Sequence, residues 1–188
     1  DISALTAALR GLEERFKARN VPIARLLRPG LSDDEIDALT AGLPFRFSDE
    51  LRCLYRWHDG ADDSTEEWVV VPGMGVLAPL AQTVDEYHRW VAMPSIPQEQ
   101  YSPTWFPINV GQHVIVVESG ITPREAGPLH VLDVKNTWGL DCAPSLLHAV
   151  QLWNQMMDDG YWTYDEYEGE WEDHLLDMPE EIRVSRLI

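Results

Sequence analysis

Residues 158 to 177 (DDGYWTYDEYEGEWEDHLLD) hold nine carboxylates and five aromatic rings, without any lysine or arginine. Disordered acidic tails usually lack aromatic rings, and buried elements usually lack charges, so neither class explains this composition. Carboxylates that alternate with tyrosine and tryptophan can form a surface that binds a basic protein. The contact residues predicted in this segment are Tyr164, Asp165, Glu166, Tyr167, Glu168, Glu170 and Trp171.

A second acidic group follows the sequence His58-Asp59-Gly60. Its acids lack the D-x-[DN]-x-[DN]-G order and the closing glutamate of a calcium-binding loop, so we interpret it as a solvated acidic loop. The same loop is the second predicted part of the partner-binding surface. Its candidate residues are Asp62, Asp63, Glu66 and Glu67.

Two cysteine and histidine pairs, Cys53 with His58 and Cys142 with His148, are the candidates for a thiol and its base. Neither spacing matches a known signature, and an acidic environment opposes thiolate formation. The histidines are dispersed, and neither a zinc pattern nor a phosphate-binding glycine motif occurs in the sequence. We therefore expect no catalytic site, no metal and no cofactor, and predict that the chain is not an enzyme.

The negative charge of the chain is unevenly distributed. Residues 1–56 hold nine acidic and nine basic side chains, whereas residues 57–188 hold 23 acidic and five basic ones, for a net charge of -18. Such a field repels nucleic-acid phosphates and anionic lipids, and it accelerates encounter with a basic protein. The charge pattern predicts a basic protein partner and excludes direct binding of nucleic acid.

Three further features concern the compartment. No apolar run approaches the 18 or so residues of a membrane span, and charges interrupt the first twenty residues, so neither a transmembrane helix nor a signal peptide is predicted. Two cysteines are too few for a disulfide framework, although a single bridge between them remains open. These features favour a reducing cytoplasm. The oligomeric state stays open.

Several helices are expected. Apolar residues at helical spacing predict a first amphipathic helix within residues 1–20. Capping-box patterns at Ser32–Glu35 and Thr83–Glu86 predict two further helix starts. Ser48 is the predicted N-cap of another helix that ends near Gly60, and residues 145–160 predict a last amphipathic helix.

Short β-like runs lie between these helices. They occupy residues 67–72, 75–80, 105–110, 113–119 and 127–134. Helices followed by strands and then by helices indicate an α+β fold, and we expect one domain over residues 1–188. Its mostly antiparallel sheet should be flanked by N-terminal and C-terminal helices.

An ordered set of motifs resembles the SUKH superfamily, also known as the Smi/Knr domain. It comprises LSDDEIDALTAGLPFRFSDELRCLYRWHDG, EEWVVVPGMGVLAP, WFPINV with HVIVVES, GPLHVLDV and SLLHAVQLWNQM. The resemblance covers about residues 31–160. It leaves residues 1–20 as an additional helix and residues 158–188 as an acidic, aromatic C-terminal extension.

The resemblance implies an α+β domain without catalytic machinery. Bacterial members resemble immunity proteins that neutralise polymorphic or contact-dependent toxin domains, often nucleases or deaminases, whereas fungal members regulate cell-wall synthesis. Twelve arginines against two lysines favour a GC-rich bacterial gene. The leading hypothesis is a cytoplasmic immunity protein that blocks a basic toxin domain, and the alternative is a regulatory scaffold of cell-wall synthesis.

Two interpretations of the acidic segment remain open at the level of sequence. Its rings and charges can form the contact surface for the partner. Alternatively, the segment is a C-terminal helix whose Tyr161, Trp162 and Trp171 pack onto the domain while its carboxylates face water.

Overall fold

The computed structural model of the chain describes residues 1–62, 76–92, 102–111, 113–120, 127–133, 138–174 and 177. Its first helix, α1 (Ile2–Ala18), confirms the helix predicted at the N-terminus, and the side chain of Asp1 caps it by accepting hydrogen bonds from two backbone amides. The apolar stripe faces inward. Leu5, Leu9, Leu12 and Phe16 are all buried.

Two of the next three helices begin where serine caps were predicted. Helix α2 (Ile23–Leu26) is a single turn, and α3 (Asp33–Thr40) starts with the capping box of Ser32 and Glu35. Helix α4 (Asp49–Trp57) starts at Ser48, whose hydroxyl accepts a hydrogen bond from the Leu51 amide at 3.2 Å. Both predicted starts are confirmed, because each cap is local in the sequence.

The predicted helix end at Gly60 is wrong. Helix α4 ends at Trp57, and Gly60 lies inside strand β2 (His58–Ala61), which pairs with β1 (Leu27–Pro29). Gly60 has a φ of +68°, and a Cβ atom at this position would lie 2.4 Å from the carbonyl carbon of Ala78. Glycine is therefore required here by a close approach of two backbones rather than by the end of a helix.

Helix α5 (Leu80–Val91) starts three residues before the predicted capping box at Thr83. The carboxylate of Asp59 accepts a hydrogen bond from the Leu80 amide at 2.8 Å and so replaces a local cap. Thr83 is buried inside the helix, where its hydroxyl contacts the Tyr55 hydroxyl at 3.0 Å. The prediction failed because the capping group comes from a distant part of the chain.

The strands form antiparallel pairs throughout the described part of the chain. The largest sheet has the order β4-β6-β7-β8, and β3 pairs with β5 beside it. The strands of these two sheets are β3 (Val76–Leu77), β4 (Trp105–Pro107), β5 (Asn109–Val110), β6 (His113–Glu118), β7 (Leu129–Asp133) and β8 (Trp138–Ala143). The predicted runs 105–110, 113–119 and 127–134 are confirmed as strands. The run 75–80 is strand only at β3, the run 67–72 lies outside the described residues, and β8 was not predicted.

The two faces of the sheet contribute to different clusters. Ile115 and Val117 of β6 belong to the main core, whereas Val114 and Val116 contact Trp90 of α5 in a smaller cluster. This alternation follows from the two-residue period of a strand.

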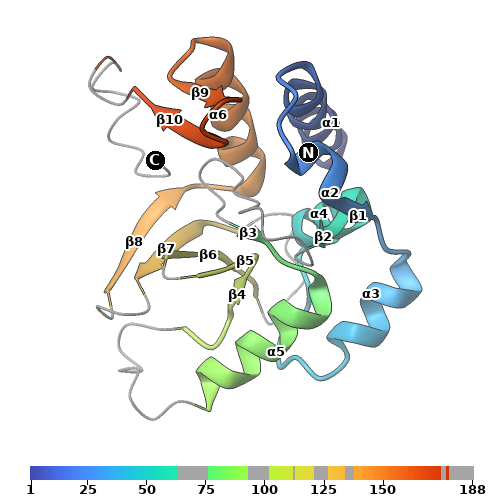
Figure 1. The fold of residues 1–188 in the computed structure, drawn as a ribbon. Coiled ribbons are helices and arrows are strands. Elements are labelled where there is room, and N and C mark those ends of the chain that lie inside the picture. Colours follow the sequence, from blue (N-terminus) through green and yellow to red (C-terminus); the bar gives the residue numbers. More distant parts are fainter. Residues whose placement is uncertain are drawn as a thin grey trace.

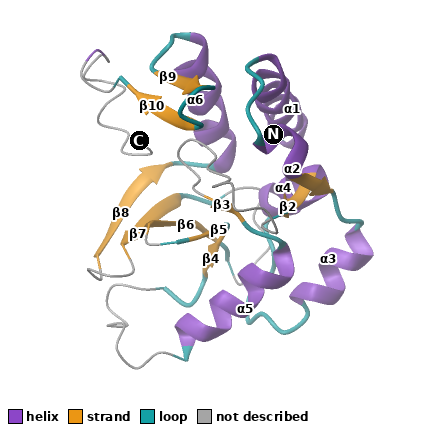
Figure 2. Ribbon diagram, viewed as in Figure 1, coloured by secondary structure: helices purple, strands orange, loops and turns teal. Residues whose placement is uncertain are grey.

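The main core connects the helices to the sheet. Figure 1 shows α1 beside the last helix, α6 (Leu146–Asp158), above the strands, and α5 beside α3 on another side. In Figure 2 the helices surround the sheet on more than one side. Trp153 of α6 and Phe106 of β4 are fully buried in the same cluster as the apolar stripe of α1. The chain is therefore a single α+β domain, as predicted, and none of the described helices combines the length and apolar character that a membrane span requires.

Candidate partner-binding surface

The acidic, aromatic segment forms a β-hairpin, so the predicted C-terminal helix is wrong, whereas the predicted packing of Tyr161, Trp162 and Trp171 onto the domain is confirmed. Strand β9 (Trp162–Asp165) pairs antiparallel with β10 (Glu170–Asp173), and Tyr164 lies opposite Trp171. The physical reason lies in the pattern of the sequence, in which rings and polar residues alternate with a period of two on both sides of the turn. The register of the two strands places the rings of Trp162, Tyr164 and Trp171 on one face of the hairpin and Asp165, Glu170 and Glu172 on the other.

The ring-bearing face fixes the hairpin to the domain. Trp162 is buried in the main core, and Tyr164 and Trp171 pack against that core as half-buried residues. The rings of Tyr164 and Trp171 meet edge to face with centroids 5.5 Å apart, and Trp171 meets Phe16 of α1 at 6.2 Å. Two of the predicted contact residues, Tyr164 and Trp171, therefore anchor the hairpin on α1 and α6.

Asp165 organises the turn at the tip. Its Oδ1 accepts hydrogen bonds from the backbone amides of Tyr167 at 2.7 Å and Glu168 at 3.1 Å. Its carbonyl accepts a third hydrogen bond from the Gly169 amide at 2.8 Å, and Gly169 has a φ of +72°. These bonds form an Asx turn that ends in a left-handed glycine and restricts the backbone on which the tip residues stand.

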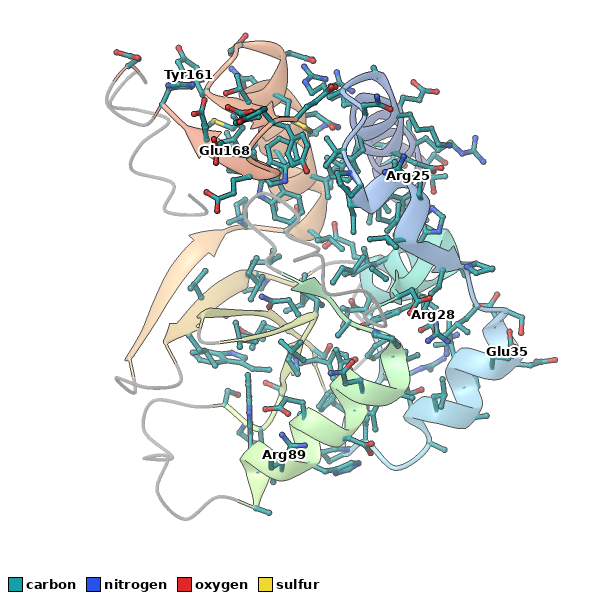
Figure 3. All side chains as sticks on the ribbon, in the orientation of Figure 1. Arg25, Arg28, Glu35, Arg89, Tyr161 and Glu168 are labelled. Carbon is teal, nitrogen blue, oxygen red and sulfur yellow. The ribbon has the colours of Figure 1, made fainter. Side chains whose placement is uncertain are left out.

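The tip presents one exposed ring among carboxylates. Tyr167 is 92% exposed, the highest exposure among the large hydrophobic side chains of the described chain. Glu166, Glu168 and Glu170 are exposed around it, and Figure 3 labels Glu168 on this hairpin. Within the described residues no basic side chain forms an ion pair with these three glutamates. We call Glu166, Tyr167, Glu168 and Glu170 the hairpin tip.

The first acid of the segment, Asp158, forms an ion pair at the surface with a distant part of the chain. Arg15 of α1 donates two hydrogen bonds to the Asp158 carboxylate, at 2.8 and 2.5 Å. These bonds lower the pKa of Asp158, and they raise that of Arg15. Arg19 adds a bond of 2.8 Å to the carbonyl of Met157. These basic neighbours could not be predicted from the sequence, because Arg15 and Arg19 lie 143 and 138 residues from their partners.

The second predicted acidic group lies elsewhere. Asp62 is exposed directly after β2, and its amide donates a hydrogen bond of 2.7 Å to the Leu26 carbonyl. In Figure 1 β2 lies near α2 and α4, well separated from β9 and β10. The structure therefore does not bring Asp62 and the hairpin tip together. Asp63, Glu66 and Glu67 lie outside the described residues.

Of the two thiol and base pairs considered from the sequence, Cys53 and His58 meet in one cavity without pairing, and the Cys142 side chain of the other pair lies outside the described residues. Cys53 and His58 both line a cavity of about 480 Å³ between α1 and α4. The Cys53 sulfur is buried and lies 3.3 Å from the Thr6 hydroxyl. The His58 ring has Nδ1 at 2.6 Å from the Arg28 carbonyl and Nε2 at 3.4 Å from a Glu13 carboxylate oxygen. Both ring nitrogens thus contact groups other than the thiol, an arrangement that does not favour a nucleophile with its base.

In the described part of the chain, no group of three or more His, Cys, Asp or Glu side chains is arranged to hold a metal ion.

Comparison with protein-family models and with curated protein sequences finds no match to this chain. The resemblance to the SUKH superfamily therefore remains a prediction from the sequence. One feature of the described residues that suits the binding of a protein is an exposed tyrosine on an ordered acidic turn.

Proposed function

We propose that this chain is a non-catalytic binding protein that recognises a basic protein surface through its hairpin tip. The carrying observation is Tyr167, which is 92% exposed on a turn held by three hydrogen bonds. A large apolar ring costs free energy in water, and tyrosine is enriched among residues that dominate binding energy at interfaces. A pre-ordered turn also lowers the entropy lost on binding.

The glutamates of the tip, which form no ion pair with a described basic side chain, define the chemistry of the partner. Their charges favour a partner with lysine and arginine, and steering by opposite charge raises the association rate. Toxin domains that act on nucleic acid carry such basic sites, because they must hold phosphates. Together with the sequence resemblance, this supports a bacterial immunity protein that covers the basic site of its cognate toxin in the cytoplasm.

The test is co-expression with the protein encoded by the neighbouring gene. The chain should relieve its toxicity and form a stoichiometric complex with it. Tyr167→Ala should weaken the complex at least tenfold, about 1.4 kcal/mol, since the ring is buried on binding. Urea unfolding of the free variant should stay within about 0.5 kcal/mol of the wild type, because the ring is exposed.

Val91→Ala is the matched control, because Val91 is a 50% exposed apolar residue on α5. This control should leave the affinity unchanged. An unaltered affinity of Tyr167→Ala would contradict the role of the hairpin tip. Failure to relieve toxicity or to form a complex would contradict the immunity function.

A further inference from the structure

The cavity between α1 and α4, called the α1–α4 pocket below, differs in charge from the rest of the molecule. Arg10 and Arg56 line it together with a single carboxylate, Glu13, whereas the whole chain carries a net charge of -18. Its volume of about 480 Å³ lies within the range of small-molecule sites, about 300 to 1,000 Å³. A positively charged pocket in an acidic protein calls for an explanation.

Glu13 is already satisfied by neighbours. It accepts a hydrogen bond of 2.5 Å from Lys17 and another of 3.3 Å from the Trp57 indole, and it lies 3.4 Å from His58. Partial burial would raise the pKa of Glu13, but the contacts with Lys17 and His58 outweigh it and lower the pKa. The carboxylate is thus ionised and compensated, and it leaves the arginines of the pocket available.

The two arginines are weakly engaged. Arg52 bonds to both Asp33 and Asp37, so the contact of Arg56 with Asp33 is secondary and long, at 3.4 Å. Arg10 is exposed and forms neither a hydrogen bond nor an ion pair with any described residue. Guanidinium groups bind carboxylate and phosphate oxygens through paired N–H donors. Both arginines can therefore meet an anion in the pocket.

The remaining wall is mostly aromatic and apolar, and it also includes Thr6 and Cys53. The rings of Trp57 and His58 meet edge to face with centroids 4.6 Å apart, and Ile2 lines the same cavity. Hydrogen bonds fix this wall, because Glu13 holds the Trp57 indole and the Arg28 carbonyl contacts Nδ1 of His58. Figure 1 places α4 below α1 and away from the hairpin, so this pocket is distinct from the hairpin tip.

We propose that the α1–α4 pocket binds a small oxyanion, a carboxylate or a phosphate monoester, carried on an aromatic or apolar group. Arg10 and Arg56 hold the anion, and Trp57 with Ile2 contacts the apolar part. This binding is independent of the proposed function, since the residues involved lie outside the hairpin.

Benzoate and phenyl phosphate are the probes, and benzyl alcohol is the neutral comparison. Binding is followed by NMR through the indole N–H signal of Trp57, which Trp57→Phe assigns. We expect saturable shifts of this signal with at least one anionic probe, and weaker binding of benzyl alcohol. Arg10→Gln should weaken the binding of the anionic probe at least tenfold. Comparison of benzoate with phenyl phosphate shows whether the natural anion is a carboxylate or a phosphate.

Arg25→Gln is the matched control, because Arg25 is an exposed arginine on α2, outside the pocket (Figure 3). This substitution removes the same charge as Arg10→Gln. It should leave probe binding unchanged. Equal weakening by Arg10→Gln and Arg25→Gln would overturn the proposal, because it would show a general charge effect. Equal binding of benzyl alcohol, or no saturable shift with either anion, would overturn it as well.

Discussion

At the scale of single residues, Glu50 shows how one side chain connects two helices. It is 2% exposed on α4, and its carboxylate accepts hydrogen bonds from the amides of Leu146 at 2.9 Å and Leu147 at 3.1 Å, at the start of α6. Burial raises the pKa of Glu50, although these two hydrogen bonds act in the opposite direction. No described basic side chain forms an ion pair with it. The negative charge is tolerated because the first amides of a helix attract an anion.

This geometry gives a pH-dependent stability. A glutamate with a raised folded-state pKa contributes most below its ordinary value of 4.5, and it loses that contribution as the pH rises through the folded-state pKa. Glu50→Gln removes the titration. The free energy of unfolding of the wild type, minus that of Glu50→Gln, should therefore decrease as the pH rises above 4.5. Urea unfolding between about pH 4 and pH 7 measures this difference.

Ser145→Ala is the control at the same helix end, since the Ser145 hydroxyl accepts a hydrogen bond of 3.2 Å from the His148 amide. It should cost about 1 kcal/mol at every pH, because a hydroxyl cap does not titrate in this range. A difference between wild type and Glu50→Gln that stays constant with pH would contradict the raised pKa of Glu50.

At the scale of elements, the hairpin and the helices show what the sequence could and could not predict. Helix α1 was predicted from its apolar spacing, and the starts of α3 and α4 were predicted from their local serine caps. The start of α5 depends on Asp59, 21 residues before Leu80, and no local pattern reveals such a cap. Trp162, Tyr164 and Trp171 alternate with polar residues, a pattern that favours strands. The high density of charges in this segment makes that pattern hard to recognise in the sequence. The pairing of Arg15 with Asp158 and the α1–α4 pocket depend on packing between distant segments, which a single sequence does not show.

The turn of the hairpin can be tested through its left-handed glycine. Gly169 has a φ of +72°, and no atom nearer than 3.9 Å crowds the position of a Cβ. Gly169→Ala should therefore cost only the strain of a left-handed residue, about 1 to 2 kcal/mol. It should also disturb the turn below Tyr167, and so weaken binding of the proposed basic partner. Urea unfolding and isothermal titration calorimetry measure the two effects.

Gly160→Ala separates stability from binding. Gly160 has a φ of +75° with open space around the Cβ position, and it follows α6 rather than lying in the turn. The stability cost should be similar and the affinity unchanged. If both variants weaken binding equally, the turn does not specifically present Tyr167.

At the scale of the whole molecule, basic and acidic parts of the chain pack against each other. Residues 1–56 are neutral overall, and several of their arginines bind groups of the acidic part: Arg15 contacts Asp158, and Arg28 contacts Asp59 at 3.1 Å. The hairpin tip lacks such partners within the described residues. Its negative charges are therefore not compensated by ion pairs with the described residues, and they can steer a basic partner.

Charge reversal of the hairpin tip tests whether its glutamates steer a basic partner. Asp165 is left intact, because its carboxylate holds the turn. The variant combines Glu166→Lys, Glu168→Lys and Glu170→Lys, and its control combines Glu14→Lys, Asp34→Lys and Asp85→Lys, three exposed acids on other elements. Both variants change the net charge by the same amount.

The decisive measurement is the stopped-flow association rate with the proposed basic partner, the protein encoded by the neighbouring gene, at low and at high salt. We expect the tip variant to associate more slowly than the control at low salt, by about tenfold or more. The gap should shrink at high salt, where exposed charges are screened. Equal rates for the two variants at low salt would contradict the claim that the hairpin tip steers and binds a basic partner.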